Sequence, residues 1–107
     1  MSARFACAVG DLAPGEVARV EFPGLAVAVV RDEDGVFHAL EDRCTHGNVN
    51  LSDGEVDGCT IECWLHGSTF DLRTGRPLSL PATKPVTVYP VTVADGRVFV
   101  DAPTPTT

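Results

Sequence analysis

The sequence has no long hydrophobic run and no long stretch with helical periodicity, and it contains few basic residues. No apolar run approaches the roughly 20 residues that a membrane-spanning helix needs. The first residues, Met1–Cys7, lack the hydrophobic core of a secretion signal. We therefore expect a soluble, cytoplasmic protein with no membrane contact.

The shortage of basic residues excludes a further class of function. Eight basic residues against fifteen acidic ones give a net charge of −7. A nucleic-acid-binding protein needs a basic stripe to displace counterions from phosphate, and an anionic membrane surface would also repel this chain. The acidic balance suits docking onto a basic partner, or it serves solubility alone.

Cysteine is scarce as well, with only Cys7, Cys44, Cys59 and Cys63 in the chain. Disulfides are not expected in a cytoplasmic protein. Each cysteine is then a candidate thiolate ligand or a buried thiol. For Cys7 and Cys59 we expect a buried, hydrophobe-like role, because cysteine outside a metal site is often buried.

What is present predicts an all-β protein. Glu16–Phe22 alternates polar and apolar residues like a half-buried strand, and Leu25–Arg31 is apolar enough to be buried on both faces. The turn signals are Pro23-Gly24, Asp34-Gly35 and Asp95-Gly96. The expected strands are Arg4–Val9, Glu16–Phe22, Leu25–Arg31, Val36–Leu40, Glu55–Val56, Cys59–Glu62, Thr69–Leu72, Val86–Val93 and Arg97–Asp101.

We expect a single domain, residues 1–107, built as an antiparallel β-sandwich. The segment 42–71 is rich in loops and is predicted to be an inserted unit. Residues 76–85 contain three prolines and should be extended, since proline cannot donate to a sheet. The Pro/Thr-rich tail, residues 102–107, is expected to be flexible.

The candidate chemistry lies in two short motifs. Cys44-Thr45-His46 is separated by sixteen residues from Cys63-Trp64-Leu65-His66. Each motif puts one thiolate and one imidazole on a turn. Four such ligands can enclose a mononuclear zinc ion or a [2Fe–2S] cluster with two histidines on one iron.

The mixing of ligands within each motif favours the cluster. Common zinc fingers pair two cysteines on one arm and two histidines on the other, whereas each arm here carries one of each. Mixed arms let one iron take both thiolates and the other both imidazoles. The small residues Gly47, Gly67 and Ser68 also favour a cluster, because backbone N–H groups must approach its sulfides.

On these residues the chain resembles the Rieske family. The resemblance extends through Ser68–Leu72, Thr74-Gly75 and the proline segment, over essentially the whole chain. It implies stacked antiparallel sheets with a cluster-binding subdomain at one tip, about residues 42–71. It also implies one [2Fe–2S] cluster, with Cys44 and Cys63 on the buried iron and His46 and His66 on the outer iron, near solvent. The expected surroundings of the cluster are Gly47, Val49, Leu65, Gly67, Ser68 and Phe70.

Departures from the respiratory members point to a subfamily. Val49 and Leu65 stand where those proteins carry a disulfide. Ser68 matches a serine that stabilises the reduced cluster, but Phe70 replaces a tyrosine that also does so. We expect a reduction potential at the low end of the Rieske range, about −150 mV, with Ser68 lifting it somewhat. These features resemble the soluble Rieske ferredoxins.

The resemblance implies a one-electron carrier and not an enzyme by itself, with no catalytic residues. Electrons would pass from an NAD(P)H-dependent flavoprotein reductase to a terminal oxygenase, and the carrier would be a monomer. An accessory protein of another redox pathway, such as iron–sulfur cluster assembly, is the alternative.

Several other residues also have an expected role. Trp64 and Leu65 are expected to cover the cluster and to meet the partner, with Val49 and Leu51 covering the first loop. The acidic residues near the site would steer a basic partner or serve solvation; they are Asp53, Glu55, Asp57 and Glu62. His38 lies outside both motifs and is expected to be structural or on the surface.

Overall fold

The structure is a computed structural model that describes residues 2–44, 49–65, 67–80, 82 and 84–102. It contains three antiparallel sheets. One sheet has the order β1 (Ser2–Ala8), β10 (Arg97–Ala102), β9 (Val91–Ala94). The second has the order β2 (Glu16–Phe22), β3 (Leu25–Arg31), β4 (Phe37–Glu41), β8 (Val88–Tyr89). The third has the order β5 (Glu55–Asp57), β6 (Thr60–Glu62), β7 (Thr69–Asp71), and the 3-10 turns are η1 (Val9–Asp11) and η2 (Leu51–Asp53).

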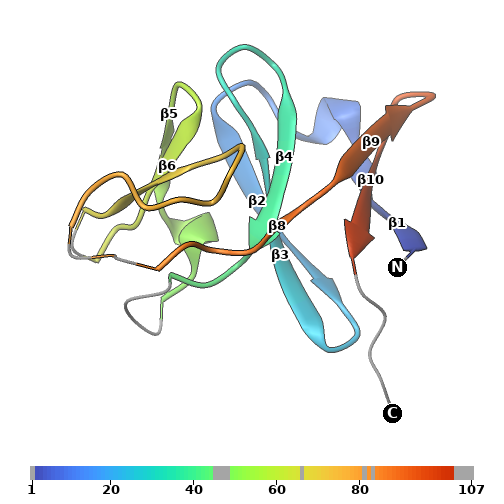
Figure 1. The fold of residues 1–107 in the computed structure, drawn as a ribbon. Coiled ribbons are helices and arrows are strands. Elements are labelled where there is room, and N and C mark those ends of the chain that lie inside the picture. The colour runs from blue at the N-terminus through green and yellow to red at the C-terminus, as the bar shows by residue number, and fades with distance from the viewer. Residues whose placement is uncertain (1, 45–48, 66, 81, 83, 103–107) are drawn as a thin grey trace.

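The four-stranded sheet lies between the other two (Figure 1). The small β5–β6–β7 sheet is at one end of the molecule, and the β1–β10–β9 sheet is at the other, where the chain begins. The all-β prediction is confirmed. Within the described residues no helix is long and apolar enough to cross a bilayer.

The predicted turns set the register of the hairpins. Pro23 and Gly24 join β2 to β3, so that Phe22 pairs with Leu25. Asp95 and Gly96 join β9 to β10 and have φ angles of 53° and 74°. Two successive residues with positive φ form the tight turn that matches the twist of antiparallel strands, which is why Asp-Gly is favoured there.

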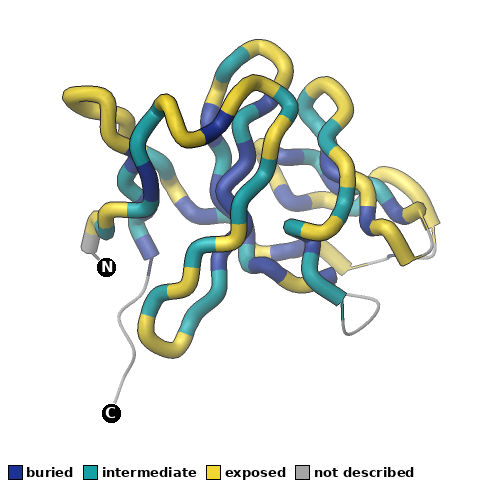
Figure 2. The backbone as a smooth tube through the Cα atoms, turned by 180° about the vertical axis from the view of Figure 1, so that it is seen from behind, coloured by how far each residue is buried: buried dark blue, intermediate teal, exposed yellow. Residues whose placement is uncertain are grey.

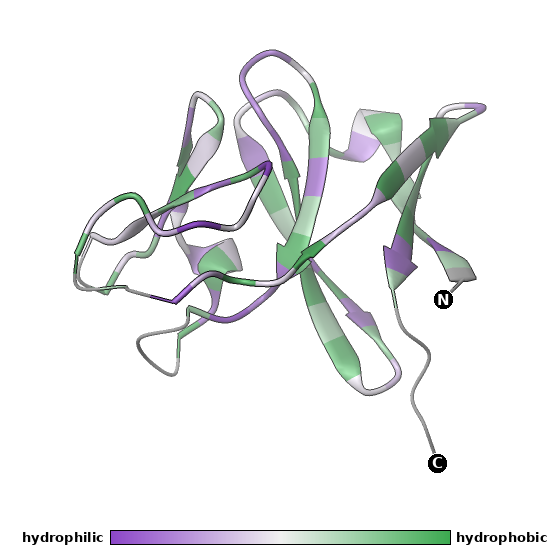
Figure 3. Ribbon diagram, viewed as in Figure 1, coloured by the Kyte–Doolittle hydropathy of each residue, from purple (hydrophilic) through white to green (hydrophobic). Residues whose placement is uncertain are grey.

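The central sheet is buried on both faces, as the apolar run in β3 predicts. Val27 and Val29 point into a core shared with the β1–β10–β9 sheet, whereas Val30 belongs to a second core shared with the β5–β6–β7 sheet. Successive side chains of a strand point to opposite faces, so one strand supplies both cores. Figure 2 shows this buried centre in dark blue, with exposed turns around it. Figure 3 shows hydrophilic residues at the β3–β4 turn and hydrophobic ones along the strands.

Three sequence predictions are corrected. The segment Val86–Val93 is not one strand, because it divides at Pro90 into β8, which pairs with β4, and β9, which pairs with β10. Proline has no N–H for the ladder, which favours a change of sheet at this point. Cys59 lies in the β5–β6 turn and not in a strand. The predicted flexible tail begins one residue too early, because Ala102 is the last residue of β10 and is fully buried.

Candidate metal centre

Two short loops, each closed at its base by backbone hydrogen bonds, carry the predicted cysteine ligands. Cys44 comes three residues after β4, and its N–H donates to the Val49 carbonyl at 2.9 Å. Cys63 follows β6 directly, and its N–H donates to the Ser68 carbonyl at 2.7 Å. The Gly67 N–H returns to the Cys63 carbonyl at 3.0 Å. Each loop therefore starts from a cysteine held against the body of the protein.

Both cysteine side chains are buried in the same apolar core. Cys44 is 1% exposed and Cys63 is 0% exposed, and neither forms a disulfide. Their neighbours in this core include Leu51, Ile61 and Phe70. Two thiols from separate loops in a dry environment are soft ligands suited to iron–sulfur or zinc chemistry, and the apolar shell limits access of water.

The other two predicted ligands, His46 and His66, lie outside the described residues, as does Gly47. The assignment of both histidines as ligands therefore stays a prediction. The donor chemistry of the described part of the site is two cysteine thiols buried in one core, and it fits a Rieske cluster on its thiolate side.

A buried carboxylate that the sequence reasoning missed anchors the first loop. The Asp42 side chain is fully buried two residues before Cys44, and it accepts a hydrogen bond from Arg19 Nη1 of β2 at 2.8 Å. It also accepts hydrogen bonds from the Ser52 N–H at 2.7 Å and the Ser52 hydroxyl at 2.6 Å. Asp42 thus ties β2, the end of β4 and η2 together. No local pattern could have revealed this, because its partners lie 10 and 23 residues away.

Gly54 permits the close packing that positions the second loop. A Cβ atom built there would collide with the backbone carbonyl of Glu62, the residue before Cys63. Its φ is −88°, so the need for glycine is close approach and not a left-handed conformation. A glycine directly before a predicted strand was the only sequence signal.

Ser68 and Phe70, which were expected near the cluster, are both fully buried. The Ser68 hydroxyl oxygen accepts a hydrogen bond from the Ala82 N–H at 3.2 Å. Its own proton therefore remains able to donate to another acceptor. Phe70 shares the apolar core with both cysteines and has no hydroxyl to offer.

Apolar side chains beside the second loop face solvent. Trp64 is 55% exposed and Leu65 is 38% exposed, and the proline segment adds Leu78 and Leu80 at 55% and 78%. Val49 is half-buried against the core, and Leu51 is fully buried in it. Leu51 therefore fills the core beneath the first loop, whereas Trp64 and Leu65 are open to contact with another molecule.

The remaining cysteines differ from each other. Cys7 is buried in the core between the larger sheets, as expected, and burial, with Asp11 nearby, raises the pKa of its thiol. Cys59 is only half-buried, and its Sγ lies 3.8 Å from His38 Nε2, so the expectation of a simple buried thiol is wrong for this residue. His38 is half-buried on β4, and its Nε2 lies 2.8 Å from Asp32 Oδ2.

Comparison with known proteins decides the family. The family model described as the Rieske [2Fe–2S] domain matches residues 2–90. This chain belongs to the Rieske family. The 3-phenylpropionate/cinnamic acid dioxygenase ferredoxin subunit of Escherichia coli strain K12 is 43% identical over 104 residues, which cover 96% of each chain.

Solved structures agree on the Rieske fold. The Sphingomonas yanoikuyae B1 ferredoxin superposes with a TM-score of 0.88 and 39% identity, covering 95% of this chain and 100% of that one. A chain in the complex of reduced oxygenase and oxidised ferredoxin of carbazole 1,9a-dioxygenase gives a TM-score of 0.86 and 42% identity, covering 92% and 91%. This Rieske protein is therefore a ferredoxin, an electron-transfer component and not a catalytic enzyme.

Proposed function

We propose that this Rieske ferredoxin carries single electrons from an NAD(P)H-dependent flavoprotein reductase to a terminal oxygenase of a dioxygenase system. One [2Fe–2S] cluster would be bound by Cys44, His46, Cys63 and His66. The observation that carries the proposal is the pair of buried thiols on two loops of one core, in a chain whose full-length relatives are dioxygenase ferredoxin subunits.

The core around the two cysteines and the Ser68 hydroxyl both support this role. Cys44 and Cys63 would hold one iron inside the apolar core, where Phe70 and Leu51 exclude water. Ser68 offers a hydroxyl proton from a buried position. When bound, a Rieske cluster supplies reversible one-electron transfer. The protein's part is to hold it at a fixed potential near the surface.

The surface around the second loop fits a docking site. Trp64, Leu65, Leu78 and Leu80 are exposed apolar side chains that a partner could desolvate on contact. Four exposed acidic residues lie on η2 and the small sheet; they are Asp53, Glu55, Asp57 and Glu62. We propose that they steer basic surfaces of the partners, and that the carrier works as a cytoplasmic monomer.

Cluster content tests the ligand assignment. Iron and sulfide analysis should give about two irons per chain, and dithionite reduction should produce the electron paramagnetic resonance signal of a Rieske centre. Cys63→Ser should abolish that signal, whereas Cys7→Ser, in the other core, should keep it. One zinc and no sulfide per chain would contradict the assignment.

Substrate turnover in a reconstituted system tests whether this ferredoxin carries electrons between a reductase and an oxygenase. The ferredoxin should support substrate oxidation when added to a flavoprotein reductase and a terminal oxygenase of the ring-hydroxylating type. His66→Cys should keep iron but lower the potential, because an anionic thiolate replaces a neutral imidazole. An unchanged potential would contradict the role of His66 as a ligand.

A further inference from the structure

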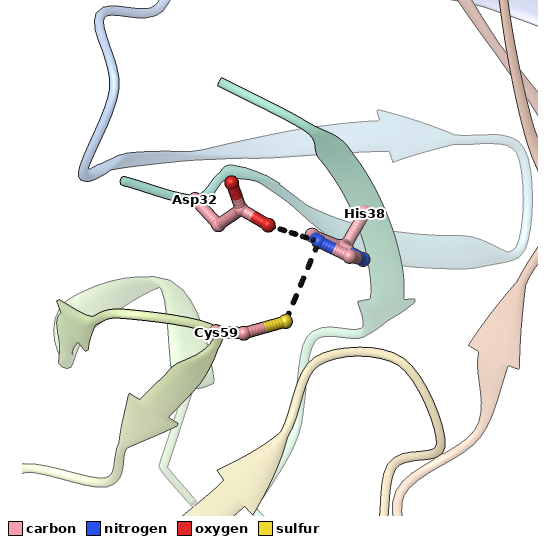
Figure 4. A group of neighbouring side chains, drawn as sticks. All are labelled: Asp32, His38 and Cys59. Atoms are coloured by element: carbon pink, nitrogen blue, oxygen red, sulfur yellow. Dashed lines mark hydrogen bonds and ion pairs between the residues drawn. The ribbon is translucent and has the colours of Figure 1, made fainter. Parts of the chain in front are cut away.

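A second group of metal-ligating side chains lies away from the two cysteine loops. Asp32 follows β3, His38 is on β4, and Cys59 is in the β5–β6 turn. One ligand atom from each converges, with all three atoms within 4.8 Å of one another. Figure 4 shows the Asp32 carboxylate and the Cys59 sulfur both directed at the same ring nitrogen of His38. We propose that these three residues bind a zinc ion, with water as the fourth ligand.

The distances suit a tetrahedral ion after small side-chain adjustments. His38 Nε2 lies 2.8 Å from Asp32 Oδ2 and 3.8 Å from Cys59 Sγ. Zinc bonds of about 2.0–2.3 Å place neighbouring tetrahedral ligand atoms about 3.3–3.6 Å apart. The observed separations lie on either side of that range. A mixed set of sulfur, nitrogen and oxygen ligands favours zinc over calcium or magnesium, which prefer oxygen alone.

The carboxylate is oriented toward the site by the backbone. Asp32 Oδ1 accepts hydrogen bonds from the N–H groups of Asp34 at 2.9 Å and Val36 at 3.0 Å. This leaves Oδ2 directed at His38, and the Asp32 and His38 side chains are only 5% and 11% exposed. Ligands that are held by such outer hydrogen bonds lose less freedom when a metal binds.

The turn that carries Cys59 is held beside the turn that carries Asp32. The Gly58 N–H donates to Glu33 Oε2 at 2.9 Å, and the Glu33 N–H approaches the Gly58 carbonyl at 3.4 Å. The site therefore joins the central sheet to the small sheet at a position that is already assembled. Zinc bound there would link the two sheets.

A basic side chain and a surface hollow border this group of residues. Arg73 lies close to Cys59, and a hydrogen bond with the Cys59 side chain is the first cause that raises the pKa of Arg73. A surface hollow of about 500 Å³ is lined by His38 and Arg73 among others, so one side of the histidine faces solvent.

Metal analysis of the untagged holoprotein tests the proposal. After equilibrium dialysis against Zn²⁺, the wild type should retain about one zinc per chain while keeping its iron. Cys59→Ser and His38→Gln should each weaken zinc binding by at least about tenfold. Cys7→Ser is the matched control and should bind zinc like the wild type.

The Rieske signal of the variants and the alkylation rate of Cys59 complete the test. Each variant should keep the reduced Rieske signal, which shows that it is folded and that the cluster is independent of this site. Zinc should slow alkylation of Cys59 by iodoacetamide in the wild type. The proposal is overturned if the wild type retains no zinc, if Cys59→Ser binds it equally well, or if zinc enters only as iron is lost.

Discussion

A single hydrogen bond from Ser68 should have a measurable effect on the reduction potential of the cluster. The Ser68 oxygen accepts from the Ala82 N–H, so its proton can donate to an acceptor in the buried site. Loss of a hydrogen bond of about 1 kcal/mol that favours the reduced form lowers a one-electron potential by about 40 mV. Ser68→Ala should show this shift in a spectroelectrochemical titration.

The control is Ser79, whose hydroxyl also accepts a backbone hydrogen bond, from Thr69, but which is exposed. Ser79→Ala should leave the potential where it is. Equal shifts in both variants would mean that the effect of Ser68 is not specific to the cluster.

Substitution of Gly54 tests whether its close approach to the backbone of Glu62 is needed for stability. A methyl group there meets the Glu62 carbonyl, so Gly54→Ala must push β6 and the start of the Cys63 loop aside. We expect a loss of about 1–3 kcal/mol in the free energy of unfolding, measured by urea denaturation. Gly10→Ala is the control, since a Cβ at Gly10 has no neighbour within 4 Å, and a similar loss there would remove the steric explanation.

At the scale of elements, Asp42 connects β2, the end of β4 and η2. Asp42→Asn removes the charge that Arg19 and Ser52 bind while keeping the size of the side chain. The free energy of unfolding should fall by about 1–3 kcal/mol, because polar groups near a buried position lose a charged partner. Glu21→Gln breaks an exposed contact of the same Arg19, and this matched variant should cost no more than about 0.5 kcal/mol.

The side chain of Tyr89, on the strand β8 that pairs with β4, has an ionisation that can be measured. Tyr89 is the only tyrosine, it is 8% exposed, and burial, with Glu41 nearby, raises its pKa. Its neutral form is favoured in the folded protein, so stability is lost as the pH rises from the unfolded value of about 10 through the higher folded pKa. Phenolate absorbance should titrate at a higher pH in the folded than in the urea-unfolded protein.

A matched variant isolates this alkaline loss. Tyr89→Phe removes the ionisable group and should lose less stability than the wild type above about pH 10. Coincident phenolate titrations of the folded and unfolded protein would show that burial does not control this group.

At the scale of the whole molecule, the net charge of −7 should control association with a basic partner. Raising ionic strength from about 50 to 500 mM shortens the Debye length and should slow electron transfer from the reductase by about tenfold or more. Asp57→Asn, on the small sheet, should lower the low-salt rate, whereas Asp95→Asn, on the far sheet, should not. Equal effects would mean that only total charge matters.

Local patterns in the sequence determined much of this protein. The alternation in Glu16–Phe22, the apolar run in Leu25–Arg31 and the turns at Gly24 and Gly96 predicted the β2–β3 and β9–β10 hairpins, because strand period and positive φ are properties of neighbouring residues. The spacing of Cys44 and Cys63 with their histidines indicated the Rieske family, because ligands on two short loops form two compact motifs in the sequence.

Contacts between residues far apart in the sequence are set by the tertiary packing. The change of sheet at Pro90 depends on which strand lies beside each half of the segment. The burial of Asp42 and the convergence of Cys59 on His38 join residues 10 to 23 positions apart, and no periodicity encodes such contacts. Side-chain contacts between sheets are fixed when the apolar faces pack, so the polar groups at their edges find partners that a linear pattern does not specify.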